Sequence, residues 1–309
     1  MGYSMEAGEK REVGVIGSGM IGIGLCVLFT AHKIPVCLLV RKSSEEKKKK
    51  YREILKSMEG IQYFETPAEI EEKYFRITDS VCELESMDII FESVAENTEV
   101  KKKIYEEVAK SCPHIKALAS TTSSLLPSIL SEGCVLKDRL LVAHPFYPVH
   151  LTSCVEIVPG PGCMKKAVSI VKRLLESVGR TPVVLHKEVP GFVANRLQYA
   201  MLREAIYLVE EGVASPGEID LILQTSFAPR YTKIGLFEHF DNCGLDLAKD
   251  ICRLVFPDLS DEKTVPNLLK EKCEQQEYGV KSGNGIYDWD EESIHSLEER
   301  IQRIYQAKE

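Results

Sequence analysis

Residues 12–41 read EVGVIGSGMIGIGLCVLFTAHKIPVCLLVR, and this stretch decides the fold class. A short β-rich run leads directly into a G-x-G-x-x-G pattern, which is followed by a helical pattern and a second β-rich run. In that setting the first glycine permits a tight turn, the second lets the backbone approach a pyrophosphate, and the third lets the helix pack on the strand. The helix N-terminus attracts phosphates. We therefore expect a dinucleotide to bind at Gly17, Ser18, Gly19, Met20, Ile21 and Gly22.

The end of the second β-rich run departs from the usual pattern. A dinucleotide-binding unit commonly places an acidic residue there, where it accepts hydrogen bonds from the adenosine ribose. Here Val40 cannot accept them, and Arg41 with Lys42 and Ser43 could instead bind a 2′-phosphate. Alternatively, Arg41 stacks on the adenine or points to solvent. NAD and NADP therefore both remain open as the cofactor.

Composition limits the classes of partner. The chain has 309 residues, of which 44% are hydrophobic and 28% are charged, so it is long enough for two domains that each bury a core. A net charge of -8 argues against nucleic acid or an anionic membrane as a partner, because either would favour a basic surface. The basic run Lys47–Lys50 follows two glutamates in a helical pattern, so a solvated helix face is favoured over a phosphate-binding patch.

The expected compartment is the cytoplasm. No run is apolar enough to span a membrane, and the first eleven residues are polar and lack the apolar core of a signal peptide. The ten cysteines are scattered and show no C-x-x-C pair. This pattern indicates reduced thiols and predicts neither a disulfide framework nor a metal site.

Short β-rich runs alternate with helical patterns up to about Lys187, and helical patterns dominate after it. The runs are Val13–Ile16, Val36–Val40, Ile89–Phe91, Ala117–Ala119, Leu140–Ala143, Val155–Val158 and Pro182–Leu185. This order predicts an α/β domain over residues 1–187, with a doubly wound, mostly parallel Rossmann-type sheet. We expect a second, all-helical domain over residues 188–309.

Capping boxes mark three predicted helix starts. They pair Ser43 with Glu46, Thr66 with Glu69, and Ser215 with Glu218. A long amphipathic helix is predicted after residues 189–191, running to about Glu211 and ending at Gly212.

Four residues from separate segments suit the oxidation of a secondary alcohol. That reaction needs a base for the hydroxyl proton, a hydride acceptor, and hydrogen bonds to the oxygen as its charge changes. His144 is the candidate base, and Glu156 can hold its other ring nitrogen. Ser123 and Asn195 can then fix the substrate oxygen. Taken singly, His144 would more often be a structural histidine and Asn195 a helix-surface residue.

At these residues the chain resembles the 3-hydroxyacyl-CoA dehydrogenase family and its λ-crystallin (gulonate dehydrogenase) branch. The shared motifs are the glycine fingerprint, ESVAENTEVKKKIYEE (residues 92–107), the serine pair at 123–124, the spacing from His144 to Glu156, PGFVANR (190–196) and KSGNGIYDW (281–289). The resemblance implies the same four catalytic roles and places Glu96, Lys101 and Lys281 beside the nicotinamide ribose and phosphates. It also implies a homodimer formed through the second domain.

Several positions depart from the family pattern. Tyr147 and Thr121 stand where the family usually has asparagine near the nicotinamide, so the substrate pocket is altered and Tyr147 is a candidate substrate contact. The segment after Arg41, which covers CoA in acyl-CoA enzymes, looks shortened. Arg230 resembles the λ-crystallin branch and could pair with a free carboxylate, since its planar fork suits that group; otherwise it is a surface arginine at a helix end.

Three functions remain open from the sequence. The first, modestly favoured by KSGNGIYDW and by the helical segment 43–58, is an NAD(P)-dependent dehydrogenase of a (3S)-3-hydroxyacyl thioester carried by CoA or an acyl-carrier protein. The second is the same chemistry on a free 3-hydroxy acid such as a sugar acid, which Arg230 favours. The third is a nucleotide-binding protein without turnover, against which the His144–Glu156 pair argues.

Overall fold

The computed structural model describes residues 12–41, 45–57 and 67–306. The chain divides into two compact units between Val193 and Ala194, a few residues past the boundary expected near Lys187. The intervening segment stays with the first unit through hydrogen bonds. Glu188 Oε2 accepts one from the backbone N–H of Ser128 at 2.9 Å, and the backbone N–H of Val193 donates to Glu156 at 2.8 Å.

The first unit is built on one eight-stranded sheet with the order β3-β2-β1-β4-β5-β6-β7-β8. Its strands are β1 (Val13–Ile16), β2 (Val36–Leu39), β3 (Phe75–Thr78), β4 (Ile89–Glu92), β5 (Ala117–Ser120), β6 (Leu140–Pro145), β7 (Cys154–Pro159) and β8 (Thr181–Val184). Neighbouring strands are parallel except β6 and β7, which form an antiparallel pair. This confirms the predicted doubly wound, mostly parallel sheet; β3 is the strand that the sequence did not predict.

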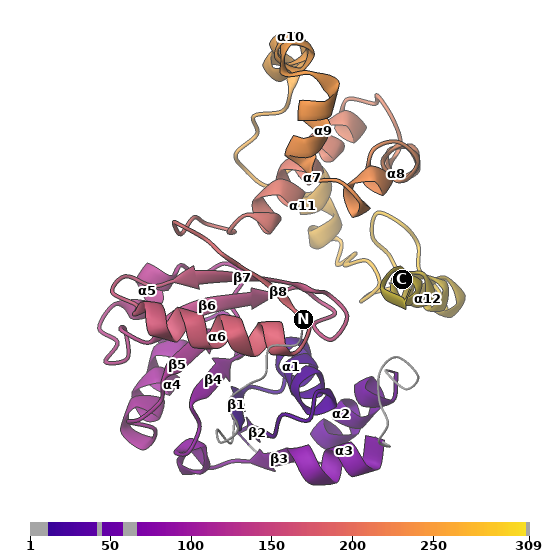
Figure 1. The fold of residues 1–309 in the computed structure, drawn as a ribbon. Helices are drawn as coiled ribbons and strands as arrows, with labels where there is room; N and C mark the ends of the chain where they lie inside the picture. The colour runs from indigo at the N-terminus through magenta and orange to yellow at the C-terminus, as the bar shows by residue number, and fades with distance from the viewer. Residues whose placement is uncertain (1–11, 42–44, 58–66, 307–309) are drawn as a thin grey trace. The chain divides into compact units, whose positions relative to one another are not determined.

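Helices cover both faces of this sheet (Figure 1). They are α1 (Met20–Ala31), α2 (Glu45–Ser57), α3 (Pro67–Tyr74), α4 (Thr98–Ser111), α5 (Pro127–Ser131) and α6 (Lys165–Ser177), with a 3-10 turn η1 (Val81–Leu84). Side chains alternate between two hydrophobic cores, as the pleat of a strand requires. On β5, Ala117 and Ala119 join the core with α1 and α6, whereas Leu118 joins the core with α4 and α5.

The second unit is built from helices joined by loops, with two isolated β-bridges among residues 279–288. It contains α7 (Ala194–Glu210), α8 (Pro216–Thr225), η2 (Ala228–Thr232), α9 (Leu236–Cys243), α10 (Leu245–Val255), η3 (Phe256–Asp258), α11 (Asn267–Glu274) and α12 (Glu291–Gln306). The capping box of Ser215 and Glu218 is present as predicted, and α7 ends just before Gly212, which has φ +70°. The predicted caps Ser43 and Thr66 lie outside the described residues.

Large apolar side chains of the second unit are exposed within a single chain. Ile206 is the one buried hydrophobic among its described side chains, while Phe237 is 84% exposed and Leu254 is 77% exposed. Monomeric proteins seldom leave so many large apolar groups in water.

The described residues form no helix with the length and apolar character needed to cross a membrane.

Candidate active site

The glycine turn between β1 and α1 forms a cradle that a side chain would fill. Gly17 has φ +105°, and a Cβ added there would lie 2.3 Å from the carbonyl oxygen of Ser93. A Cβ on Gly22 would lie 2.0 Å from the carbonyl oxygen of Gly17. Gly19 faces open space, and no side chain caps α1 at its N-terminus. Free backbone N–H groups at a helix start with open space before them fit a pyrophosphate.

A pocket of about 880 Å³ opens beside this turn. Its lining includes residues 17–19, the ends of β2 and β4, and the side of α4. Val40 is 5% exposed and apolar, whereas Arg41 is exposed, and both line the pocket together with Lys47 and Asp79. The pocket therefore lies where the adenosine part of a dinucleotide would bind. The predicted contacts Lys42 and Ser43 lie outside the described residues.

A smaller neighbouring pocket joins the glycine turn to the serine segment. Gly19, Met20 and Ile21 line it together with Glu96 and the segment 121–123. Ser93 and Val94, which directly follow β4, line both pockets. Fingerprint residues and Ser123, which lie about a hundred residues apart in the sequence, thus meet at the carboxyl edge of the parallel strands, where doubly wound sheets bind ligands.

A buried ion pair underlies this edge. Lys101 Nζ donates to Glu92 Oε1 at 2.7 Å, and the two residues are 1% and 0% exposed. Glu92 also accepts from Tyr105 Oη, Ser120 Oγ and the backbone N–H of Val94, each at 2.8 Å. A buried carboxylate needs this many donors, because an unpaired charge in the interior is very costly. The sequence analysis missed Glu92; its only signal was an acidic residue at the end of an apolar strand.

Glu96 links Lys101 to the serine segment. Lys101 Nζ lies 3.4 Å from Glu96 Oε2. Glu96 Oε1 accepts hydrogen bonds from the Thr122 hydroxyl, from the Ser124 hydroxyl at 3.0 Å and from the backbone N–H of Ser123 at 3.2 Å. Partial burial by itself raises the pKa of the Glu96 carboxyl, but the Thr122 hydrogen bond and the Lys101 charge outweigh burial and hold this pKa below its ordinary value. Glu96 is therefore a carboxylate at neutral pH.

His144 and Glu156 form a buried pair. The antiparallel register of β6 and β7 sets them directly opposite each other, with 2.9 Å between His144 Nδ1 and Glu156 Oε2. Because a carboxylate only accepts, Nδ1 carries the proton and Nε2 is left as the basic nitrogen. Nε2 makes no hydrogen bond with any described residue. This nitrogen is not fully buried, so it remains in contact with solvent.

Two aromatic rings flank the imidazole. The ring centroids of Phe146 and Phe192 lie 4.6 and 5.5 Å from that of His144. Phe192 is fully buried and has φ +50°, a backbone region that large side chains rarely adopt. Glu156 Oε1 binds the next residue, accepting from the backbone N–H of Val193 at 2.8 Å. The two phenylalanine rings and the hydrogen bond to Glu156 thus hold the imidazole in place. The sequence analysis singled out neither phenylalanine.

The remaining predicted residues lie apart from these contacts or in the second unit. Tyr147 is 62% exposed, in the loop between β6 and β7. Asn195 is the second residue of α7, and Lys281 lies in the turn between the bridged residues Gly279 and Asn284. Arg230 lies in η2, where its guanidinium donates to His239 Nε2 at 2.9 Å. The roles of these four residues stay predictions.

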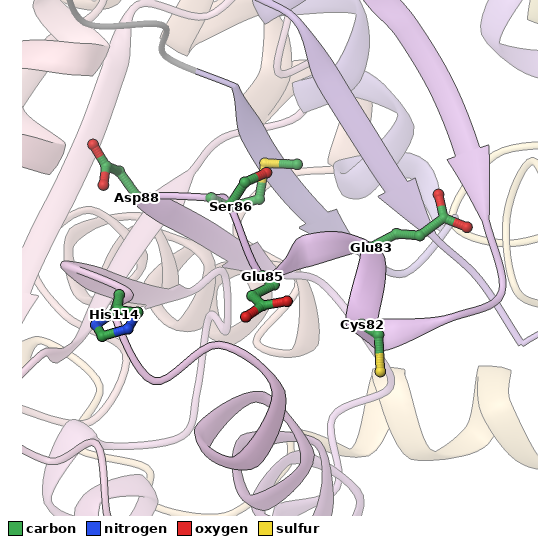
Figure 2. A pocket seen from close by; sticks show the side chains of 7 residues that line it. Cys82, Glu83, Glu85, Ser86, Asp88 and His114 are labelled. Carbon is green, nitrogen blue, oxygen red and sulfur yellow. The ribbon is translucent and has the colours of Figure 1, made fainter.

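Figure 2 shows a further pocket, which lies at the opposite edge of the sheet. Asp88 and His114, which line it, come just before β4 and β5, so they lie at the amino ends of these strands. Two of its carboxylates are already paired, Glu83 with Arg76 and Asp88 with Lys116. None of the predicted site residues lines this pocket, so it is separate from the candidate active site.

A glycine turn at the carboxyl edge of a Rossmann-type sheet, with a His–Glu pair across β6 and β7 of the same sheet, is typical of a nicotinamide-dependent oxidoreductase. Comparison with known proteins agrees. Residues 12–189 match the NAD-binding domain of 3-hydroxyacyl-CoA dehydrogenase, and residues 191–289 match its C-terminal domain. The chain therefore belongs to the 3-hydroxyacyl-CoA dehydrogenase family, as the sequence motifs predict.

Relatives within this family act on different substrates. The chain is 31% identical over 231 residues to 5-formyl-3-hydroxy-2-methylpyridine 4-carboxylate 5-dehydrogenase of Mesorhizobium japonicum, covering 74% of this chain and 75% of that protein. It is 35% identical over 231 residues to the lambda-crystallin homolog of Bos taurus, covering 73% and 72%. A crystal structure of an NAD+-dependent 5-formyl-3-hydroxy-2-methylpyridine 4-carboxylic acid 5-dehydrogenase superposes with a TM-score of 0.86 at 26% identity, covering 97% and 99%.

Proposed function

We propose that this protein oxidises the secondary alcohol of a 3-hydroxy acid, with His144 as the general base. The observation that carries the proposal is the buried His144–Glu156 pair at the carboxyl edge of the sheet. Glu156 holds the Nδ1 proton, so Nε2 can take the proton of the substrate hydroxyl, and the carboxylate stabilises the imidazolium that results. The nicotinamide cofactor supplies the hydride acceptor.

In the same proposal Ser123 and Asn195 bind the substrate oxygen. A hydroxyl or amide N–H that donates to this oxygen stabilises it as it becomes a carbonyl, and stabilises the negative charge that develops on it in the reverse direction. Ser123 lines the pocket that the glycine turn also lines, which supports its role. In the reverse reaction the His144 imidazolium returns its proton to the same oxygen.

A free carboxylate is the substrate handle that we favour. Arg230 is exposed and carries a guanidinium suited to a carboxylate. The Mesorhizobium japonicum relative is also named for a substrate that carries a carboxylate. In addition, the two helices after β2 are short, with α2 having 13 residues and α3 having 8, which fits the reduced CoA-covering segment expected from the sequence.

A 3-hydroxyacyl thioester is the second candidate. The family is described by its action on 3-hydroxyacyl-CoA, and residues 281–289 carry the KSGNGIYDW motif shared with the acyl-CoA branch. A spectrophotometric assay of nicotinamide reduction or oxidation separates the two, using free 3-hydroxy acids, acetoacetyl-CoA and an acyl-carrier-protein thioester. Higher kcat/KM for a free acid supports our choice, and higher kcat/KM for a thioester overturns it. Cofactor binding without turnover of any of them would indicate a non-catalytic nucleotide-binding protein.

Arg230 offers a matched test of the carboxylate. Replacing Arg230 with Lys keeps the charge but removes the planar fork, so we expect KM for a free acid to rise about tenfold or more. Lys233→Gln, a change at a nearby exposed cation, is the control and should leave KM unchanged. Equal effects of the two changes would remove Arg230 from substrate binding.

For the cofactor we propose that NADP binds at least as well as NAD. Val40 offers no acceptor for a ribose hydroxyl, while Arg41 and Lys47 bring positive charge to the pocket. Arg41→Ala should weaken NADP binding about tenfold or more and NAD binding far less, measured by fluorescence titration. Lys49, an exposed cation of the same helix as Lys47, provides the control when changed to Ala. Equal losses for the two cofactors would refute a phosphate-binding role for Arg41.

A homodimer is the third part of the proposal. The exposed apolar side chains of the second unit, such as Phe237 and Leu254, support it, because a second copy would remove them from water. Sedimentation at micromolar concentration should give twice the mass of the chain. A monomer under these conditions would contradict the proposal.

A further inference from the structure

An arginine, a histidine and a cysteine form a small polar cluster in the second unit. Arg230 lies in η2, while His239 and Cys243 are four residues apart on one face of α9. Arg230 Nη1 lies 2.9 Å from His239 Nε2 and 3.4 Å from His239 Nδ1. The Cys243 sulfur lies 3.7 Å from His239 Nδ1. The imidazole therefore connects the 3-10 turn to the helix.

The guanidinium decides how this imidazole is protonated. Because a guanidinium only donates, His239 Nε2 accepts the hydrogen bond from Arg230 and carries no proton. The ring proton is then on Nδ1, where the sulfur of Cys243 is within reach as a weak acceptor. His239 therefore acts in its uncharged form, as an acceptor that holds one end of the guanidinium.

One edge of the Arg230 guanidinium stays open. Nη2 lies 3.5 Å from the carbonyl oxygen of Ser226, which is at the limit for a hydrogen bond, and Nε makes no hydrogen bond with any described residue. The side chain is exposed, and no described carboxylate forms an ion pair with it. The Nε–Nη2 edge of an arginine presents two N–H groups that match the two oxygens of a carboxylate.

We propose that His239 is a positioning residue for Arg230 and thereby sets the preference for a free carboxylate. Because His239 binds Nη1, the Nε–Nη2 edge is the one left to meet the substrate. The proposal rests on the proposed function, since the carboxylate in question is that of the 3-hydroxy acid. It adds a residue to which the sequence analysis gave no role.

The uncharged state of the acceptor favours this role over a purely structural one. A carboxylate on α9 would join the helix to η2 more strongly than an imidazole, because hydrogen bonds between opposite charges are the stronger ones. It would also neutralise Arg230. The imidazole of His239 instead fixes the guanidinium and leaves its positive charge uncompensated, which suits a ligand that brings the negative charge.

Kinetics on the full-length protein separate positioning from a structural role. His239→Leu removes the acceptor, so we expect KM for a free acid to rise about 3- to 10-fold with kcat within about twofold. The methyl ester of the same acid has no charge for Arg230 to bind, so its KM should stay within about twofold. His239→Gln restores an acceptor and should bring KM for the acid to within about twofold of the wild type.

A matched control lies on the same helix. Asn242 is exposed on α9 and makes no hydrogen bond with any described residue. Asn242→Leu introduces the same side chain as His239→Leu and should leave KM for the acid and for the ester unchanged.

Two measurements link the effect to Arg230. In an Arg230→Lys background, which lacks the planar fork, His239→Leu should raise KM by less than about twofold further. In the substrate-free protein, nitrogen NMR can follow rotation of the Arg230 guanidinium about its Nε–Cζ bond. This rotation should be at least about threefold faster in His239→Leu than in the wild type, because the hydrogen bond that restrains Nη1 is lost.

The outcomes separate the two proposals. Equal rises in KM for the acid and the ester, or additive effects of the two changes, would overturn the positioning role of His239. Unchanged rotation of the guanidinium would overturn it as well. An unchanged KM in Arg230→Lys alone would instead remove the carboxylate contact from the proposed function, and the NMR measurement would still decide whether His239 holds the guanidinium.

Discussion

Replacing Glu156 with Gln tests how the base is oriented. The amide that replaces the carboxylate has one acceptor and one donor, and the structure determines which goes where. The backbone N–H of Val193 lies 2.8 Å from Glu156 Oε1, so the amide oxygen must stay there and the N–H₂ group must face His144 Nδ1. Nδ1 then has to accept, which moves the ring proton to Nε2 and blocks its action as a base.

The expected loss combines two effects. Removing the charge beside the imidazolium costs about 1.5–3 kcal/mol, or roughly 10- to 150-fold in rate. The inverted tautomer adds to this, and the same carboxylate-to-amide exchange in serine-protease triads lowers kcat by about 10⁴. We therefore expect kcat to fall about 10³- to 10⁴-fold in Glu156→Gln.

Steady-state kinetics, cofactor titration and thermal unfolding should be measured together on this variant. Because the amide keeps the shape of the side chain and its bond to Val193, the affinity for the cofactor should stay within about twofold and the Tm within a few degrees. A kcat within tenfold of the wild type, measured on folded protein with the cofactor bound, would refute the claim that Glu156 orients His144. A large fall in Tm would mean that the pair is mainly structural.

Two further predictions concern the glycine turn and a partly buried histidine. Gly17→Ala should abolish cofactor binding in a titration and lower the free energy of unfolding by about 2 kcal/mol or more. The reason is that the new Cβ would lie 2.3 Å from the carbonyl oxygen of Ser93, at a residue whose φ is +105°. Unchanged cofactor affinity would contradict the role of this turn in binding the pyrophosphate. Burial, with the charge of Arg180, lowers the pKa of His150 from 6.5 to about 4, so the unfolded chain takes up the proton first and stability is lost as the pH falls from about 6.5 toward 4. Since His150 is only partly buried, we expect the free energy of unfolding to fall by about 1–2 kcal/mol over this pH range. Urea unfolding at about pH 7.5 and pH 4.5 should show a smaller fall for His150→Gln than for the wild type. Equal falls in the two proteins would contradict the lowered pKa of His150.

The sheet could be predicted because its signals are local. Apolar β-rich runs between helical patterns gave seven of the eight strands, and the glycine turn placed the first crossover. Strand β3 was missed because Phe75–Thr78 is short and half polar and lies at the edge of the sheet, so its strand character comes from pairing with β2. The antiparallel pairing of β6 with β7 likewise depends on the loop between them.

In the candidate site, the contact between His144 and Glu156 was predictable because one hairpin carries both residues. His144 and Glu156 are twelve residues apart, and the register of β6 and β7 brings them opposite each other. The residues that pack against or hydrogen-bond the site residues could not be found from sequence spacing. Lys101 looks like a solvated charge in an amphipathic helix, and its burial appears only once β4 supplies Glu92. Phe192 packs on the imidazole from a segment 48 residues further along the chain.

The most direct test of the account is turnover by His144→Gln. Its nicotinamide absorbance change should be followed with the best substrate and cofactor found for the wild type. We predict that kcat falls by about two to four powers of ten while the cofactor affinity is nearly unchanged, since removing a general base acts on the transition state. Turnover equal to that of the wild type would remove His144 from the chemistry and contradict the account.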